Sequence, residues 1–285
     1  MILEFPGIFH RKTTVGDWGR RVARKIRRVL GWCHWRVRTF PAIDRRIVHI
    51  FGAQRSGTGA LSNSFERDLR ATVFREDSQI TGLGSNRLRL RPLEDLESIF
   101  CDTLTPLIVT KPLVESQRAN ELLDRFSASG IWMIRSYQDV VASNLKRFSR
   151  QIENLGKLVE NCGSDWRSEN VSDDTRQFAA RHFAPDMDRA NAAALMWYAR
   201  NVLFFEQHLE NRPDVFVCRY EDLVCNPGFV MRKIYSFIRS PFPGEHITVE
   251  FDTASIGLSK TLDLHPAIER RCRELEAELD RQCAA

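Results

Sequence analysis

Four short apolar runs, each followed by a helix-forming stretch, divide most of the chain beyond Pro41. The runs are rich in β-branched and aromatic residues and cover residues 46–52, 106–110, 130–135 and 214–220. The helices are expected over residues 58–69, 115–127, 138–148 and 228–238. Strands that alternate with helices form a parallel sheet covered on both faces. The sequence therefore predicts an α/β fold of three layers, with a central, mostly parallel β-sheet flanked by helices.

A glycine-rich turn follows the first predicted strand. In the segment GAQRSGTG, residues 52–59, Gly52 and Gly57 have the spacing of the two glycines in a nucleotide phosphate-binding loop. Glycines let backbone N–H groups turn toward an anion, and the next helix presents its positive end. The turn therefore predicts a P-loop-like fold with an anion site at the carboxyl end of the first strand.

This loop departs from that of nucleoside-triphosphate enzymes at one position. Thr58 follows Gly57 where those enzymes carry a lysine, and Arg55 inside the loop supplies the nearby positive charge. The missing lysine is the residue that binds the β- and γ-phosphates beside magnesium. The substitution therefore argues against an ordinary kinase or GTPase.

The run RIVHIFGAQRSGTGAL, residues 46–61, resembles the 5′-phosphosulfate loop of sulfotransferases that use 3′-phosphoadenosine 5′-phosphosulfate (PAPS). In that family the loop cradles the phosphosulfate of the donor. The resemblance implies that the donor is held by Gln54, Arg55, Ser56, Gly57, Thr58 and Gly59.

A second segment carries the same resemblance. Arg135 ends the third predicted strand, and Ser143 follows eight residues later, two turns into the next helix. The family uses such a pair to grip the 3′-phosphate of the donor. An arginine suits this role because its guanidinium binds phosphate oxygens in a bidentate manner.

Two later segments resemble the family more weakly. The stretch RYEDL, residues 219–223, implies that Tyr220 lies near the adenine or has a structural role. The stretch IGLSK, residues 256–260, resembles the loop that folds over the donor, with Lys260 on its phosphates. The implied organisation is a single sulfotransferase domain over residues 47–285, whose donor-covering loop and helix occupy about 255–283.

The resemblance also implies a reaction. A sulfuryl group passes from PAPS to a hydroxyl or amine of a glycan, glycolipid or small-molecule acceptor, adenosine 3′,5′-bisphosphate (PAP) is released, and no metal is needed. Arg55 and Lys111, where the family often has a lysine facing the sulfuryl group, are expected to stabilise charge. Leu113 stands where cytosolic hormone-type members carry a histidine base. Carbohydrate-type and many bacterial members use a Glu shortly after the first helix, so the resemblance implies Glu76 as the base, with Asp77 as second choice.

The positive charge of the chain is concentrated at its start. Residues 1–46 contain 12 Lys or Arg and 3 Asp or Glu, a net charge of +9, whereas the whole chain carries +5. Between Asp17 and Arg38 apolar residues recur every three or four positions, which predicts a basic amphipathic helix. It either docks on the core or lies on an anionic membrane surface through residues 11–40. Nucleic acid or an anionic glycan is the least favoured partner, because the rest of the chain is mildly acidic.

Composition narrows the class of protein. With 43% hydrophobic and 28% charged residues among 285, the chain is typical of a globular protein. No run approaches the ~18 consecutive apolar residues of a membrane span. The 7 cysteines form no CxxC pair, which favours reduced thiols in the cytoplasm over zinc or a disulfide framework. A cytoplasmic enzyme is expected, either free or peripheral on the membrane.

The acceptor site is harder to place. Variable segments over 77–105 and 150–190 are expected to build it, and residues 150–185 are interpreted as a polar, irregular lid or insertion. Residues 186–211 are expected to form a long helical stretch that belongs mainly to the core. A P-loop small-molecule kinase and a non-catalytic nucleotide-binding adaptor remain as alternative functions.

Overall fold

The computed structural model describes most of the chain after its basic start. The described residues are 45–76, 78–82, 88–160, 165–249, 251, 253–257 and 262–283. Residues 1–44, with the predicted amphipathic helix, lie outside them, as do Asp77 and Lys260. What the sequence predicts for those residues, including membrane association, therefore stays a prediction.

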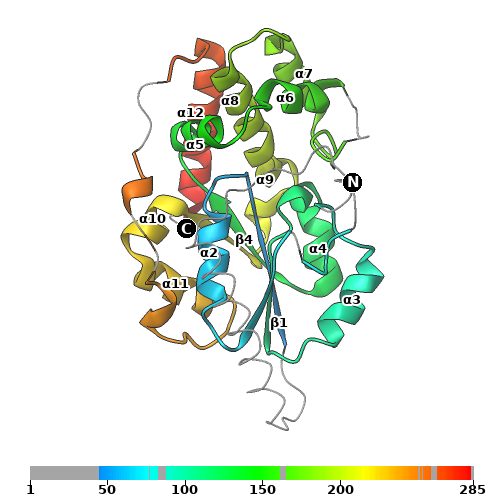
Figure 1. The fold of residues 1–285 in the computed structure, drawn as a ribbon, viewed down its shortest axis with the longest axis vertical. Coiled ribbons are helices and arrows are strands. Elements are labelled where there is room, and N and C mark those ends of the chain that lie inside the picture. Colours follow the sequence, from blue (N-terminus) through cyan, green and yellow to red (C-terminus); the bar gives the residue numbers. More distant parts are fainter. Residues whose placement is uncertain are drawn as a thin grey trace, which may run out of the picture.

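The centre of the fold is a sheet of five parallel strands in the order β2-β3-β1-β4-β5 (Figure 1). The strands are β1 (Arg46–Gly52), β2 (Ala71–Phe74), β3 (Leu107–Thr110), β4 (Ser129–Ile134) and β5 (Val215–Arg219). β1 lies in the middle, with its Arg46 opposite Leu107 of β3 and its Val48 opposite Ser129 of β4. The predicted α/β fold with a parallel sheet is thereby confirmed.

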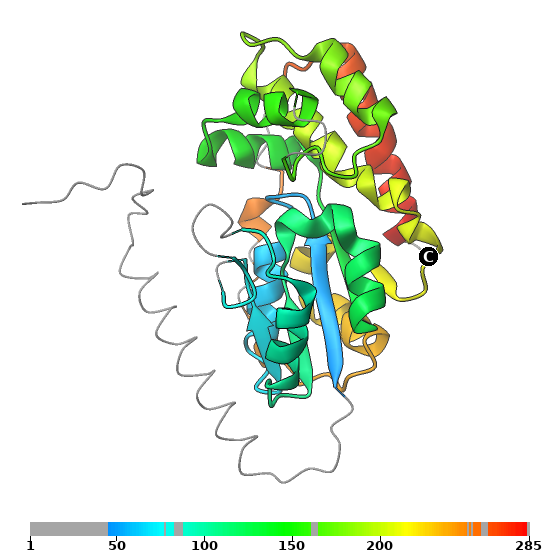
Figure 2. The same cartoon turned by 90° about the vertical axis from the view of Figure 1, so that its right-hand side faces the viewer.

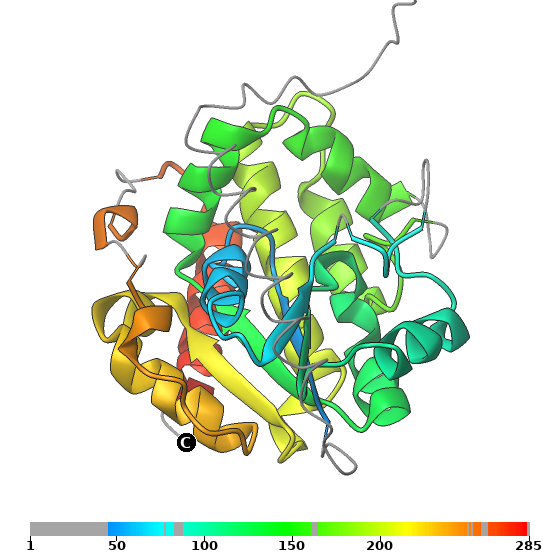
Figure 3. The same cartoon turned by 60° about the horizontal axis from the view of Figure 1, so that its bottom comes forward.

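Helices cover both faces of the sheet because side chains alternate along each buried strand. Val48 and Ile50 of β1 belong to a core shared with α2 (Thr58–Phe65), α10 (Tyr220–Cys225) and α11 (Pro227–Phe237). Phe51 and Trp132 point to the opposite face, where α4 (Ala119–Phe126) packs after η2 (Leu113–Arg118). Figure 3 shows α11 and α3 (Leu93–Cys101) on either side of the strands.

A further group of helices lies mostly beyond one end of the sheet, and some of its residues, such as Phe204 and Asp280, also contact the strands (Figures 1 and 2). They are α5 (Tyr137–Arg147), α6 (Gln151–Glu160), α7 (Asp173–His182), α8 (Arg189–Asn201), α9 (Leu203–Glu206) and α12 (Pro266–Cys283). The long helical stretch expected over 186–211 is α8 followed by α9 and a short 3₁₀ turn. The irregular conformation expected over 150–185 is wrong, because α6 and α7 form there and bury Leu155, Leu158 and Phe178.

Two other predictions differ from the structure. The helix expected over 58–69 ends at Phe65, because buried Asp68 turns the chain by accepting from the Arg70 N–H at 2.9 Å. The segment expected to be a variable loop over 77–105 contains helix α3. β2 also has no counterpart among the predicted strands, because it has only four residues and sits at the sheet edge.

A buried histidine gives the central strand a pH-dependent contribution to stability. His49 is 1% exposed, and its Nδ1 lies 2.6 Å from the Thr110 hydroxyl oxygen. Burial lowers the pKa of His49 to about 4.

We expect the free energy of unfolding to fall as the pH drops from 6.5 toward 4. The unfolded chain takes up a proton at His49 near its ordinary pKa of about 6.5, while the folded chain resists protonation until about 4. The loss amounts to roughly 3 kcal/mol at most. Urea unfolding of the wild type and of His49→Gln at pH 7 and pH 4.5 measures it. The variant should lose less stability over this interval, and equal losses in both proteins would contradict the prediction.

Candidate active site

Every strand of the sheet ends next to a residue that the sequence placed in the site. The glycine-rich loop follows β1, Glu76 follows β2, Lys111 follows β3, Arg135 follows β4 and Tyr220 follows β5. Parallel strands end at one common edge of a sheet, which is where α/β proteins bind ligands. The strand order places Glu76 and Lys111 on one side of the loop and Arg135 and Tyr220 on the other.

The loop has a backbone path that requires glycine at two positions. A Cβ atom at Gly52 would lie 2.4 Å from the carbonyl oxygen of Met133. At Gly57, where φ is +89°, a Cβ atom would lie 2.1 Å from the Tyr220 ring. The loop therefore packs directly against β4 and against the residue that follows β5.

The surroundings of the Ser56 side chain indicate whether this loop suits an anion. Its side chain is fully buried, and within the described part of the chain its hydroxyl oxygen has no hydrogen-bond partner. Helix α2 begins two residues later with no side-chain cap, so its first N–H groups also need an acceptor. A buried hydroxyl beside an uncapped helix start fits a phosphate oxygen.

The two predicted halves of the donor site contact each other. The Arg55 Nε donates to the Ser143 hydroxyl oxygen at 2.9 Å, and the Arg135 Nη1 donates to the Arg55 carbonyl oxygen at 3.2 Å. Partial burial, together with the neighbouring Arg147 and Arg135 cations, lowers the pKa of Arg55. Positive charge is thus concentrated where the resemblance implies a multiply charged donor.

Arg135 is held by partners that leave part of its guanidinium free. The residue is 7% exposed, lies 4.6 Å from the centre of the Tyr220 ring and is 3.5 Å from the Asp139 carboxylate. Among the described residues its Nε has no hydrogen-bond partner, although it is buried. Asp139 was not among the predicted site residues. Asp139 follows Arg135 by four residues, a spacing that brings side chains together on a helix, and this spacing could have identified it.

The start of the predicted donor-covering loop is anchored on these same residues. The backbone carbonyl of Ser255, in the short helix η5 (Thr253–Ser255), accepts from Arg135, and the Ser255 hydroxyl lies 2.7 Å from the Tyr220 hydroxyl. Asp139 accepts from the Gly257 N–H at 3.0 Å. The described part of this loop therefore lies against Arg135 and Tyr220.

Lys111 and Glu76 form an ion pair at the other side of the loop. Their charged atoms are 2.8 Å apart, and the side chains are 9% and 24% exposed. The sequence proposed both residues for catalysis without a reason to place them in contact. Their neighbourhood follows from β2, which delivers Glu76 beside the end of β3.

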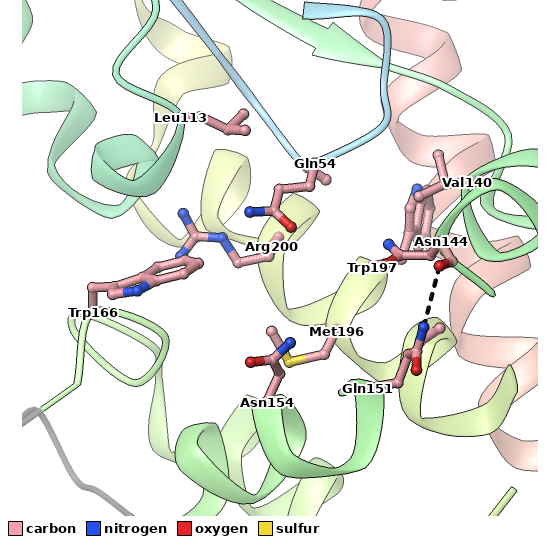
Figure 4. A pocket seen from close by; sticks show the side chains of 12 residues that line it. Gln54, Leu113, Val140, Asn144, Gln151, Asn154, Trp166, Met196, Trp197 and Arg200 are labelled. Carbon is pink, nitrogen blue, oxygen red and sulfur yellow. Dashed lines mark hydrogen bonds between the residues drawn. The ribbon is translucent and has the colours of Figure 1, made fainter. Parts of the chain in front are cut away.

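A pocket opens next to the loop, between the strand ends and the group of helices beyond them (Figure 4). It holds about 530 Å³ of empty space, its mouth included. The loop contributes Ala53 and Gln54. The other lining residues are Leu113, Val140, Asn144, Gln151, Asn154, Trp166, Ala193, Met196, Trp197 and Arg200.

Sequence reasoning missed most of this pocket. The lining residues of α6 and Trp166 come from the segment that was interpreted as irregular, although an acceptor-binding role for it was considered. Arg200 lies in a helical stretch assigned to the core. Arg200 follows buried Trp197 by three residues and Met196 by four, so it lies on an apolar helix face. An arginine at such a position is the sequence signal that could have identified it as a pocket residue.

The described residues contain no group of three or more His, Cys, Asp or Glu side chains placed to hold a metal ion. No helix among them combines the length and apolarity needed to cross a membrane.

Taken together, these elements define an α/β protein with a parallel sheet and a glycine-rich loop at its strand ends. No protein-family model and no curated protein matches the chain by sequence. Among solved structures, the sulfotransferase domain from the curacin biosynthetic pathway aligns over 83% of this chain and 98% of its own, with a TM-score of 0.51 and 14% identity. The chain therefore has the sulfotransferase fold.

Other solved sulfotransferases align with lower scores. The sulfotransferase from Alicyclobacillus acidocaldarius covers 84% of this chain and 94% of its own, with a TM-score of 0.48 and 14% identity. Mouse sulfotransferase SULT7A1, complexed with PAP, covers 85% and 86%, with a TM-score of 0.43 and 14% identity. Because both scores lie below 0.5, the fold assignment rests on the first comparison.

Proposed function

We propose that this protein transfers a sulfuryl group from PAPS to an acceptor hydroxyl or amine and releases PAP. The observation that carries the proposal is the contact between the two donor motifs, in which Arg55 reaches Ser143 and Arg135 reaches the Arg55 carbonyl. The Ser56 hydroxyl and the Arg135 Nε, both buried and without a hydrogen-bond partner among the described residues, add polar groups that suit phosphate oxygens.

Each side of the loop has a distinct part in this proposal. Ser56 and the loop N–H groups hold the 5′-phosphosulfate, while Arg135 and Ser143 bind the 3′-phosphate. Tyr220 and Asp139 position Arg135, and Lys260 joins from the loop that follows Gly257. Bound PAPS supplies an activated sulfuryl group, whose sulfur exchanges its bond to the phosphate oxygen for a bond to the acceptor oxygen.

The reaction also needs a proton acceptor and charge stabilisation. Glu76 takes the proton of the acceptor hydroxyl, and its pairing with Lys111 holds the carboxylate in place at the strand ends. Lys111 and Arg55 face the charge that gathers on the sulfuryl oxygens and the leaving phosphate. Positioning and electrostatics supply most of the catalysis, as they do in phosphoryl transfer.

A thermal-shift experiment tests the proposed donor. PAP at 100 times its dissociation constant stabilises a protein by about 2.7 kcal/mol, enough to raise the melting temperature by several degrees. We expect this rise with PAP in the presence of EDTA, and none of that size with ATP and magnesium or with GTP and magnesium. Stabilisation by ATP with magnesium alone would favour the kinase, and no response to any nucleotide would contradict a donor site of this kind.

A further inference from the structure

Among the described residues that line the pocket beside the loop, Arg200 is the one with a charged side chain. The other lining residues are apolar, aromatic or amide side chains. Arg200 is 6% exposed, and in Figure 4 its guanidinium lies between Gln54 and Trp166. The Arg200 guanidinium carbon is 5.2 Å from the Trp166 ring centre.

This guanidinium lacks an anionic partner among the described residues. Its Nη2 donates to the Oε1 of the neutral Gln117 amide at 3.0 Å, and its buried Nη1 has no hydrogen-bond partner in the part of the chain that the structure describes. No described carboxylate forms an ion pair with it.

Glu115 and Glu169 are the two carboxylates whose negative charge raises the pKa of Arg200, but both also pair with other cations. Glu115 accepts from Arg89 at 2.7 Å and pairs with Arg118 at 3.4 Å. Glu169 pairs with Arg89 at 2.8 Å and accepts from Gln117 at 2.9 Å.

Burial lowers the pKa of Arg200 to about 10, which still leaves it positively charged at neutral pH. A buried cation whose N–H groups lack a counter-ion is costly to the folded protein. A ligand that brings a negative charge would remove that cost.

The remainder of the pocket indicates what the rest of the ligand looks like. Leu113, Met196, Trp166 and Trp197 offer apolar and aromatic surface. The enclosed part of the pocket is far smaller than the 530 Å³ that includes its mouth, so it suits a small molecule rather than a polymer segment. A single cation matches a single negative charge, so a carboxylate fits better than a doubly charged phosphate.

We infer that the acceptor is a small hydroxy acid, whose carboxylate binds Arg200 and whose apolar body lies against Trp166 and Met196. The ligand's hydroxyl points past Gln54 toward the loop, and only this part of the assignment rests on the proposed function. The carboxylate site itself is independent of sulfuryl transfer. Arg200 acts as the residue that selects acids over neutral alcohols of the same shape.

The test uses pairs of probes that differ in charge alone. The acids are 4-hydroxyphenylacetic acid and linear ω-hydroxy acids of six to twelve carbons, each paired with its amide. Calorimetry measures their binding to the full chain, with and without saturating PAP, and PAP binding is measured separately. For at least one pair we expect the wild type to bind the acid about 10-fold or more tightly than the amide, as charged hydrogen bonds provide.

Two variants and a matched control show whether Arg200 causes the preference for the acid over its amide. Arg200→Gln should bind acid and amide equally, while Arg200→Lys should keep part of the preference for the acid. Arg167→Gln is the control, because Arg167 also lies over the Trp166 ring, at 4.4 Å, but pairs with Asp165 at 2.8 Å. That variant should retain the full preference.

The outcomes separate this inference from the proposed function. No preference for any acid in the wild type, including a failure of every probe to bind, would overturn the inference. A preference that survives in Arg200→Gln would do the same. If the acids bind through Arg200 but PAP does not bind, the carboxylate site stands and sulfuryl transfer fails. If PAP binds but the acids show no preference, only the hydroxy-acid assignment fails.

Discussion

Turnover should fall by about 10²- to 10⁴-fold when Glu76 is replaced by glutamine, the range expected for loss of a general base. The glutamine carbonyl can still accept from Lys111, so the contact between the ends of β2 and β3 is kept. The affinity for PAP should stay within about twofold, since Glu76 lies on the side of the loop away from Arg135. Transfer of labelled sulfate from PAPS measures the rate, with an acceptor found by screening hydroxy acids, carbohydrates and lipids.

A second carboxylate provides the comparison for this experiment. Asp77→Asn changes the residue next to Glu76 and should leave most of the activity. Full activity in Glu76→Gln together with a loss in Asp77→Asn would transfer the role of base to Asp77. A loss of PAP binding in Glu76→Gln would instead show that the residue serves the donor and not the proton transfer.

Truncating Arg135 to alanine should weaken PAP binding by about 30-fold or more, because removing one partner of a buried charged contact costs at least about 2 kcal/mol. The same change leaves Asp139 without its arginine, so the variant is also expected to melt at a lower temperature. Arg135→Lys keeps a charge there, yet loses the bidentate geometry, and should show an intermediate affinity. Calorimetry with PAP at two salt concentrations gives the affinities.

Arg147→Ala is the matched control for bulk charge. Arg147 is exposed in the last turn of α5 and close enough to lower the pKa of Arg55, but it lies outside both donor motifs. Its removal should change PAP affinity only a few-fold, and less at high salt. Equal losses in Arg147→Ala and Arg135→Ala would mean that general positive charge, and not placement, attracts the donor.

The sequence predicted the parts of this fold that depend on strong local patterns. The strands around β1 are runs of β-branched and aromatic residues. The loop after β1 has two glycines at the spacing of a phosphate-binding loop. These features also predicted where Arg55, Arg135 and Tyr220 would gather, because all of them follow strand ends. Their roles in binding and catalysis stay predictions.

The parts that escaped prediction depend on contacts between distant segments. β2 is recognisable only through its pairing with β3, and without β2 nothing places Glu76 next to Lys111. Arg200 is unusual because it forms no ion pair with a described carboxylate. Glu115 and Glu169 pair with other arginines, which no local pattern reveals. The pocket is lined by residues from several segments, so no single helix predicts it.

The backbone of the loop has a consequence for how this chain balances stability against activity. Arg55 adopts a left-handed conformation with φ of +73°, which costs a non-glycine residue about 1–2 kcal/mol. A glycine would follow the same path without that cost, so the arginine is the less stable choice at its own position. Optimising this chain for thermal stability alone would favour glycine here and would remove the cation that the proposed reaction depends on.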